Sequence, residues 1–293
     1  MILNIPAKPP FSLSSVINSH GWMRLKPFGT MDREDILIYI YQAKNLQVVK
    51  LVIKESTDGV AVELVGDMEE SQLEEINSAV RWMLALDEDF TEFYALTNHE
   101  PKLQQVEKKA QGRLLRSPNL FEDIVKTILT TNTSWSGTIR MTAALVEQFG
   151  DPFHGSNNEY AFPAPDRIAR SDEQTLREVT RLGYRAPYIL QLSQEVSSGS
   201  LDLNAYKSSE MEPDQVHSQL LSIKGIGNYA AANLMMLLGY YDYLTIDSWA
   251  LKMVSQEFFN GDQISPQDVK DVFERWGKWK GLVYWLWNWS DTK

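Results

Sequence analysis

The sequence predicts an α+β fold that is mainly α, with a small antiparallel-sheet N-terminal domain followed by an all-helical domain. Apolar segments rich in Ile, Val, Leu and Tyr alternate with turn sequences as far as residue 65. Helical periodicity then dominates, and a glycine-containing hairpin joins two of the later helices. We therefore expect a domain boundary near residue 85, with domains at 1–85 and 86–293.

The N-terminal sheet is predicted from three strand-like segments. Turn sequences separate them, at 43–45 and 56–59. The strands are expected at 36–42, 47–55 and 60–65. A helical pattern with Leu73, Ile76, Val80 and Met83 on one side follows, and it is expected to cover one face of the sheet.

The helical part begins with capping signals and ends in an aromatic segment. Ser117 with Pro118 is typical of a helix start, and the polar break 130–134 ends that helix. Ser171 with Gln174 has the pattern of a capping box. The segment 276–289 carries a dense aromatic stripe, which is more typical of a core than of a ligand pocket.

The hairpin at about 213–239 is the feature with the clearest chemical meaning. Gly225 and Gly227 permit positive φ and place no side chain in front of the next helix, whose first amides are unpaired. Such a turn can hold a phosphate. Asp247 follows Gly227 by twenty residues. Taken alone, it is an ordinary helix N-cap.

Composition narrows the class of protein. The absence of cysteine excludes disulfides and cysteine-ligated clusters. No segment approaches the roughly 20 apolar residues that cross a bilayer, so we expect a soluble intracellular protein, in the cytoplasm or bacterial nucleoid, or in the nucleus of a eukaryote. A net charge of -11 disfavours simple nucleic-acid binding. However, a basic surface is expected within 101–140 from these residues: Lys102, Lys108, Lys109, Arg113, Arg116, Lys126 and Arg140.

The hairpin and the spaced aspartate, together with segments 116–132 and 182–186 and the aromatic end, resemble the helix-hairpin-helix (HhH-GPD) DNA glycosylase superfamily. The resemblance covers most of the chain and is closest to the DNA-3-methyladenine glycosylase II and 8-oxoguanine glycosylase group. It implies base-excision repair, in which a damaged base is flipped out of duplex DNA and its N-glycosidic bond is hydrolysed. It also implies double-stranded DNA containing damaged bases as the partner, no membrane, and a monomer.

The resemblance assigns roles to particular residues. Asp247 would be the catalytic carboxylate. The DNA-binding hairpin would consist of Lys224, Gly225, Ile226, Gly227, Asn228 and Tyr229. Asn132 and Thr133 would form the wedge that contacts the orphan base, and Tyr229 and Trp279 would line the base pocket. No cofactor is required, although a structural Na⁺ or K⁺ would be held by the backbone carbonyls of Leu221, Ile223 and Ile226.

The residue two positions after Gly227 indicates the reaction type. Relatives that also cleave the strand carry there a lysine that forms a Schiff base, whereas this chain has Tyr229. Lys224 lies on the other side of the two glycines. We therefore expect a monofunctional enzyme. Alkylated purines are the expected substrate because they are cationic and already good leaving groups, although Asn233 stands where an aromatic pocket residue was expected.

Three alternatives remain open at the level of sequence. The segment Leu182–Ala186 and the loop at Asn132 also fit an 8-oxoguanine-type glycosylase. Helix-hairpin-helix units occur in non-enzymatic DNA-binding and damage-recognition proteins, for which the acidity of the chain gives some support. In an unrelated helical protein, the two glycines would only form a tight turn.

Overall fold

The structure, a computed structural model, describes residues 1–30, 35–156, 158–207 and 211–287. The chain forms two compact units. The sheet unit consists of residues 1–88 and 113–205, and the hairpin unit consists of residues 89–112 and 206–293. The predicted helical domain therefore contributes to both units. Asn288 and Trp289, at the end of the aromatic segment, lie outside the described residues.

The sheet unit contains a five-stranded antiparallel sheet in the order β1-β5-β4-β3-β2. The three predicted strands are present, and β1 and β2 add an edge strand on either side. β1 pairs with β5 from Ile2 opposite Glu63, and β2 pairs with β3 from Phe28 opposite Tyr39. The strands are β1 (Ile2–Pro6), β2 (Phe28–Thr30), β3 (Ile36–Gln42), β4 (Val48–Ser56) and β5 (Gly59–Val65).

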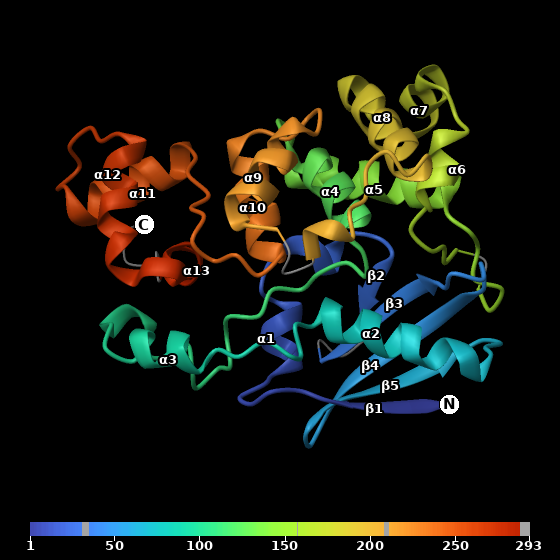
Figure 1. Ribbon diagram of the computed structural model, residues 1–293, viewed down its shortest axis with the longest axis horizontal. Helices are drawn as coiled ribbons and strands as arrows, with labels where there is room; N and C mark the ends of the chain where they lie inside the picture. Colours follow the sequence, from blue (N-terminus) through green and yellow to red (C-terminus); the bar gives the residue numbers. More distant parts are fainter. Residues whose placement is uncertain (31–34, 157, 208–210, 288–293) are drawn as a thin grey trace. The chain divides into compact units, whose positions relative to one another are not determined.

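Helices complete the sheet unit. The predicted helix α2 packs on the sheet, where the Tyr41 hydroxyl on β3 donates to the Glu75 carboxylate at 2.8 Å (Figure 1). The helices of this unit are α1 (Leu13–Ile17), α2 (Leu73–Met83), α4 (Leu120–Thr130), α5 (Trp135–Phe149), α6 (Pro165–Ala169), α7 (Glu173–Thr180) and α8 (Ala186–Ser197). A 3-10 turn, η4 (Gly183–Arg185), precedes α8.

Two predicted helix starts are wrong by one or two residues. Asn119, not Ser117, caps α4, because Ser117 is buried and its hydroxyl accepts instead from Lys126 Nζ at 3.3 Å. Asp172, not Ser171, caps α7 by accepting from the Thr175 amide at 2.9 Å. In both places a nearby Asn or Asp side chain is as good a cap as the serine, so the local sequence does not show which of the two residues caps the helix.

The described residues of the hairpin unit form helices joined by turns and loops, with no strand among them. Its helices are α3 (Thr91–Thr97), α9 (Pro213–Ser222), α10 (Asn228–Leu237), α11 (Ser248–Phe258), α12 (Pro266–Phe273) and α13 (Lys280–Leu286). The predicted cap Asp247 is confirmed at the start of α11, and Ser265 caps α12. Much of the aromatic segment is buried in one core, as predicted. The aromatic residues of this core include Phe90, Phe93, Tyr241, Phe273, Trp276, Trp279, Tyr284 and Trp287.

The prediction of a basic surface over 101–140 is wrong for three of its cations. Arg113, Arg116 and Lys126 are buried. Arg113 donates to backbone carbonyls, including that of Ala85 at 3.1 Å, and Lys126 pairs with the buried Glu122 carboxylate at 2.6 Å. These cations fix loops and helices instead of facing solvent.

Among the described residues, no helix has the length and apolar character of a membrane span.

Candidate active site

The hairpin between α9 and α10 has the open turn that its sequence predicts. Gly225 has a φ of 96°, in the left-handed region that favours glycine, and the Ile226 amide donates to the Ile223 carbonyl at 3.0 Å. Gly227 is the N-cap of α10, and a Cβ placed on it would have no atom within 4 Å. The first turn of α10 therefore faces open space, as an anion-binding helix start requires.

The three carbonyls assigned to a cation fit that role chemically. Within the described residues, the carbonyls of Leu221 and Ile226 accept no backbone hydrogen bond, while that of Ile223 accepts only the one from Ile226. A carbonyl oxygen has two lone pairs, so each retains an acceptor site. Backbone carbonyls are ligands that hard monovalent cations accept in place of water. The cation itself remains a prediction.

Asp247 caps α11 with one carboxylate oxygen and leaves the other available. Its Oδ1 accepts from the Ala250 amide at 2.8 Å, whereas Oδ2 makes no hydrogen bond to any described residue. The side chain is exposed. Capping fixes the carboxylate without consuming its charge. The N-cap reading and the catalytic reading of Asp247 are therefore compatible in this structure.

Helix α13 packs closely against the segment that leads to Asp247. The Gly281 amide donates to the Tyr241 carbonyl at 2.7 Å, and a Cβ at Gly281 would overlap the carbonyl oxygens of Tyr241 and Tyr243. The same helix carries Tyr284. Burial raises the pKa of the Tyr284 phenol, and the nearby Asp247 carboxylate and Tyr229 phenol raise it further. Tyr284 is therefore a neutral group in the electrostatic field of the candidate site.

The two aromatic residues assigned to the base pocket lie in different environments. Tyr229 is 43% exposed at the start of α10. Trp279 is only 7% exposed, and its indole stacks on Tyr241 with centroids 5.4 Å apart and planes 16° apart. The Trp279 indole N–H is buried without an acceptor among the described residues. Contact between Trp279 and a base stays a prediction, and it requires a base to reach an almost covered side chain.

The predicted wedge lies between α4 and α5 in the sheet unit. Asn132 has a φ of 47°, and both Asn132 and Thr133 are exposed. The Asn132 side-chain amide donates to the Tyr184 hydroxyl at 3.4 Å, and the Arg185 guanidinium donates to the carbonyl of Thr131. Arg185 is only 6% exposed, and its guanidinium carbon lies 4.4 Å from the centre of the Tyr184 ring.

Sequence reasoning missed several residues that shape these sites. Gly281, Tyr284 and Tyr184 were not assigned a role there. A glycine inside a helical pattern usually has a packing reason, so Gly281 carried a usable signal. Tyr284 was hidden in the aromatic stripe, and nothing in its spacing distinguishes it from core neighbours such as Leu282 and Val283.

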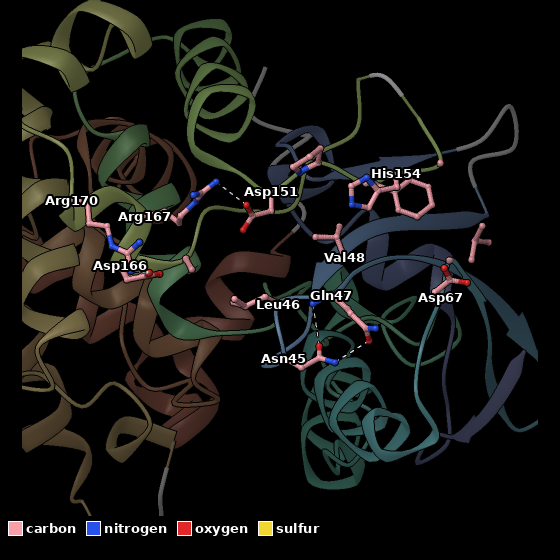
Figure 2. A pocket seen from close by; sticks show the side chains of 16 residues that line it. Asn45, Leu46, Gln47, Val48, Asp67, Asp151, His154, Asp166, Arg167 and Arg170 are labelled. Carbon is pink, nitrogen blue, oxygen red and sulfur yellow. Dashed lines mark hydrogen bonds and ion pairs between the residues drawn. The ribbon is translucent and has the colours of Figure 1, made fainter.

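A cavity of about 770 Å³ lies elsewhere, in the sheet unit. Figure 2 shows it between the β3–β4 turn, the loop after α5 and helix α6. Arg167 points toward Asp151 at 2.8 Å, and Arg170 pairs with Asp166 at 2.9 Å. None of the predicted site residues lines this cavity. The candidate active site is therefore built from the hairpin and Asp247, not from this cavity.

Comparisons with known proteins identify the family to which this fold belongs. A family model described as "HhH-GPD superfamily base excision DNA repair protein" matches residues 125–278. A DNA-3-methyladenine glycosylase of Bacillus subtilis (strain 168) is 25% identical over 226 residues, which cover 75% of this chain and 74% of that protein.

Solved structures of similar fold cover nearly the whole chain. A 3-methyladenine DNA glycosylase from Archaeoglobus fulgidus has a TM-score of 0.74 at 21% identity, covering 98% of this chain and 97% of its own. A Clostridium acetobutylicum 8-oxoguanine glycosylase/lyase, in complex with double-stranded DNA, has a TM-score of 0.73 at 20% identity, covering 96% and 92%.

The family match extends over more than half of the chain. The chain belongs to the HhH-GPD superfamily of base excision DNA repair proteins. It is a DNA glycosylase, an enzyme that hydrolyses the N-glycosidic bond between a base and its sugar.

Proposed function

We propose that this DNA glycosylase is monofunctional and releases alkylated purines from double-stranded DNA, leaving an abasic site. Two features together carry the proposal. Asp247 has an available Oδ2, and the hairpin has Tyr229 at the position where strand-cleaving relatives have a lysine. The 3-methyladenine activity in the name of the Bacillus subtilis relative supports the choice of substrate.

The proposed reaction needs one carboxylate and no amine. The N-glycosidic bond breaks with its electron pair leaving on the purine, and positive charge develops on the sugar. The Asp247 carboxylate stabilises that charge. Water then adds to the anomeric carbon, and its extra proton passes to the surrounding solvent. An alkylated purine is cationic before the bond breaks, so it leaves as a neutral base without a general acid.

The remaining residues bind the DNA. The amides at the start of α10, around Gly227 and Tyr229, would hold a backbone phosphate, a contact that fixes position without reading sequence. A cation on the carbonyls of Leu221, Ile223 and Ile226 would stiffen the turn that presents these amides. Asn132 and Thr133 would contact the base opposite the lesion. We propose that the protein acts as a monomer.

Base release from a panel of lesion-bearing duplexes tests this function, with wild type compared with Asp247→Asn. Release of N3- or N7-alkylated purines by wild type, abolished in the variant while duplex binding is retained, is the expected result. Equal release by both proteins contradicts the role of Asp247. Binding without release of any alkylated purine by wild type contradicts the proposed substrate.

An 8-oxoguanine-type activity is the second candidate. Tyr184 and Arg185, in the segment that resembles that group, contact the Asn132 turn and so favour it. The absence of a lysine at position 229 opposes it. An 8-oxoguanine duplex in the same panel separates the two activities, because only the second candidate releases that neutral base.

A further inference from the structure

Trp249 is an exposed aromatic residue on the helix that Asp247 caps. Its side chain is 46% exposed, whereas the other described tryptophans are buried or partly buried. An indole has the largest apolar surface of any side chain, so leaving half of it in water forgoes stabilisation that the other tryptophans obtain. A single exposed apolar residue is ordinary. Its place in the chain, two residues after Asp247, is the second observation.

The backbone places Trp249 at the chemically active end of its helix. It is the second residue of α11, which starts immediately after Asp247 and runs for 11 residues. Side chains on a helix lean toward its N-terminus, so the indole extends toward the end that carries the Asp247 carboxylate. The N-terminal end of a helix also attracts negatively charged groups such as DNA phosphates.

A second exposed aromatic belongs to the same group. Tyr229 is 43% exposed, and it and Asp247 both act electrostatically on the buried Tyr284 hydroxyl, so these groups share one neighbourhood of the hairpin unit. The indole of Trp279 stacks on the ring of Tyr241. The exposed aromatic surface near Asp247 is therefore supplied by α10 and α11, not by the aromatic core.

We propose that Trp249 contacts the extruded base and, with Tyr229, favours a cationic alkylated purine. This inference rests on the proposed function and names a specificity-determining residue for it. An indole is the best aromatic partner for a cation, and its flat face also stacks on any purine. Trp249 thereby takes the role that the family resemblance assigned to Trp279.

Single-turnover release of N7-methylguanine, with enzyme in excess, tests the proposal in Trp249→Ala, Trp249→Phe and Gln256→Ala. Gln256 is an exposed, uncharged residue seven positions further along α11 and therefore on the same face of the helix. We expect Trp249→Ala to slow release by about tenfold to a hundredfold, the usual effect of losing one base–aromatic stack. Trp249→Phe, which keeps a ring, should lose much less, and Gln256→Ala should match wild type.

A second duplex separates a base contact from a backbone contact. It carries a tetrahydrofuran abasic analogue in the same sequence, so it has no base to stack. Trp249→Ala should bind it with an affinity within about twofold of wild type. The proposal is overturned if Trp249→Ala loses affinity for this duplex in proportion to its loss of release. It is also overturned if Trp249→Ala releases the base as fast as Gln256→Ala. Wild type that releases no alkylated purine overturns the proposed function itself, whatever the variants do.

Discussion

The indole of Trp279 lies nearly parallel to the phenol ring of Tyr241, with ring centroids 5.4 Å apart. Phe93 and Phe90 pack against the same indole at 5.2 and 5.9 Å. This arrangement is that of a core residue, although the family resemblance assigned Trp279 to the base pocket. The two roles make different predictions about stability.

Trp279→Ala should lower the free energy of unfolding by about 3 to 5 kcal/mol, because it leaves a large cavity in an aromatic core. Trp279→Phe should cost less, since it keeps a ring against Tyr241. Urea unfolding of both variants measures this, with the exposed Tyr229→Ala as the control expected to change little. A stable Trp279→Ala protein that has lost base release would instead restore the pocket role.

Asp247 is predicted to show separate effects on stability and on activity. Asp247→Ala removes the cap of α11 and should cost about 1 kcal/mol, whereas Asp247→Asn keeps an equivalent cap and should cost almost nothing. Both variants should lose base release, since neither has a carboxylate. Thermal unfolding and base release are measured on the same samples. An inactive but fully stable Asp247→Asn protein shows that the charge, not the fold, is responsible.

Gly281→Ala is expected to displace the segment that carries Asp247. The added methyl group would overlap the carbonyls of Tyr241 and Tyr243, and overpacking of this kind costs about 1 to 3 kcal/mol. Base release should fall with it. Gly29→Ala is the control, because a Cβ there meets nothing closer than 4.0 Å. Unchanged release in Gly281→Ala would mean that the contact with α13 does not position Asp247.

Borohydride trapping tests the reaction type directly. Without a lysine at position 229, the protein should form no covalent adduct with lesion-bearing DNA while it still releases the base. A strand-cleaving glycosylase run in parallel confirms that the assay detects adducts. A trapped complex that disappears in Lys224→Ala would show that Lys224 acts as the nucleophile from the other side of the hairpin.

Two buried groups in the sheet unit should affect stability in opposite directions between about pH 4 and pH 6. Burial lowers the pKa of His20 to about 4, despite its hydrogen bond with the Leu115 carbonyl. The unfolded chain therefore binds more protons there, and the His20 contribution to stability rises with pH. Burial raises the pKa of Asp123 to about 6, against hydrogen bonds from Ser117 and Trp22. The folded chain then binds more protons, and the Asp123 contribution falls as pH rises.

The two contributions should nearly cancel in the wild type. Asp123→Asn keeps the acceptor for Trp22 and removes the falling contribution, so its stability should rise with pH by up to about 1.4 kcal/mol per unit relative to wild type. His20→Gln should change the slope in the opposite direction. Unfolding free energies measured from pH 4 to pH 6.5 decide this, and parallel curves for all three proteins would contradict it.

The sequence alone determined the features that depend on local chemistry. Strand periodicity predicted the three central strands, and Gly225 predicted the turn of the hairpin because its φ of 96° lies in the left-handed region that favours glycine. Asp247 was correctly read as a cap, since its hydrogen bond to Ala250 closes within one helical turn. The identity of residue 229, which indicates the reaction type, is also a property of sequence.

Only the tertiary structure decided which side chains face solvent. Trp249 and Trp279 are the same residue type, both in helical sequence, yet one is 46% and the other 7% exposed. Arg113 and Lys126 look like DNA-binding cations until their buried partners are known. Burial depends on contacts between residues far apart in the chain, such as Phe90 and Trp279. Local sequence patterns do not predict such contacts.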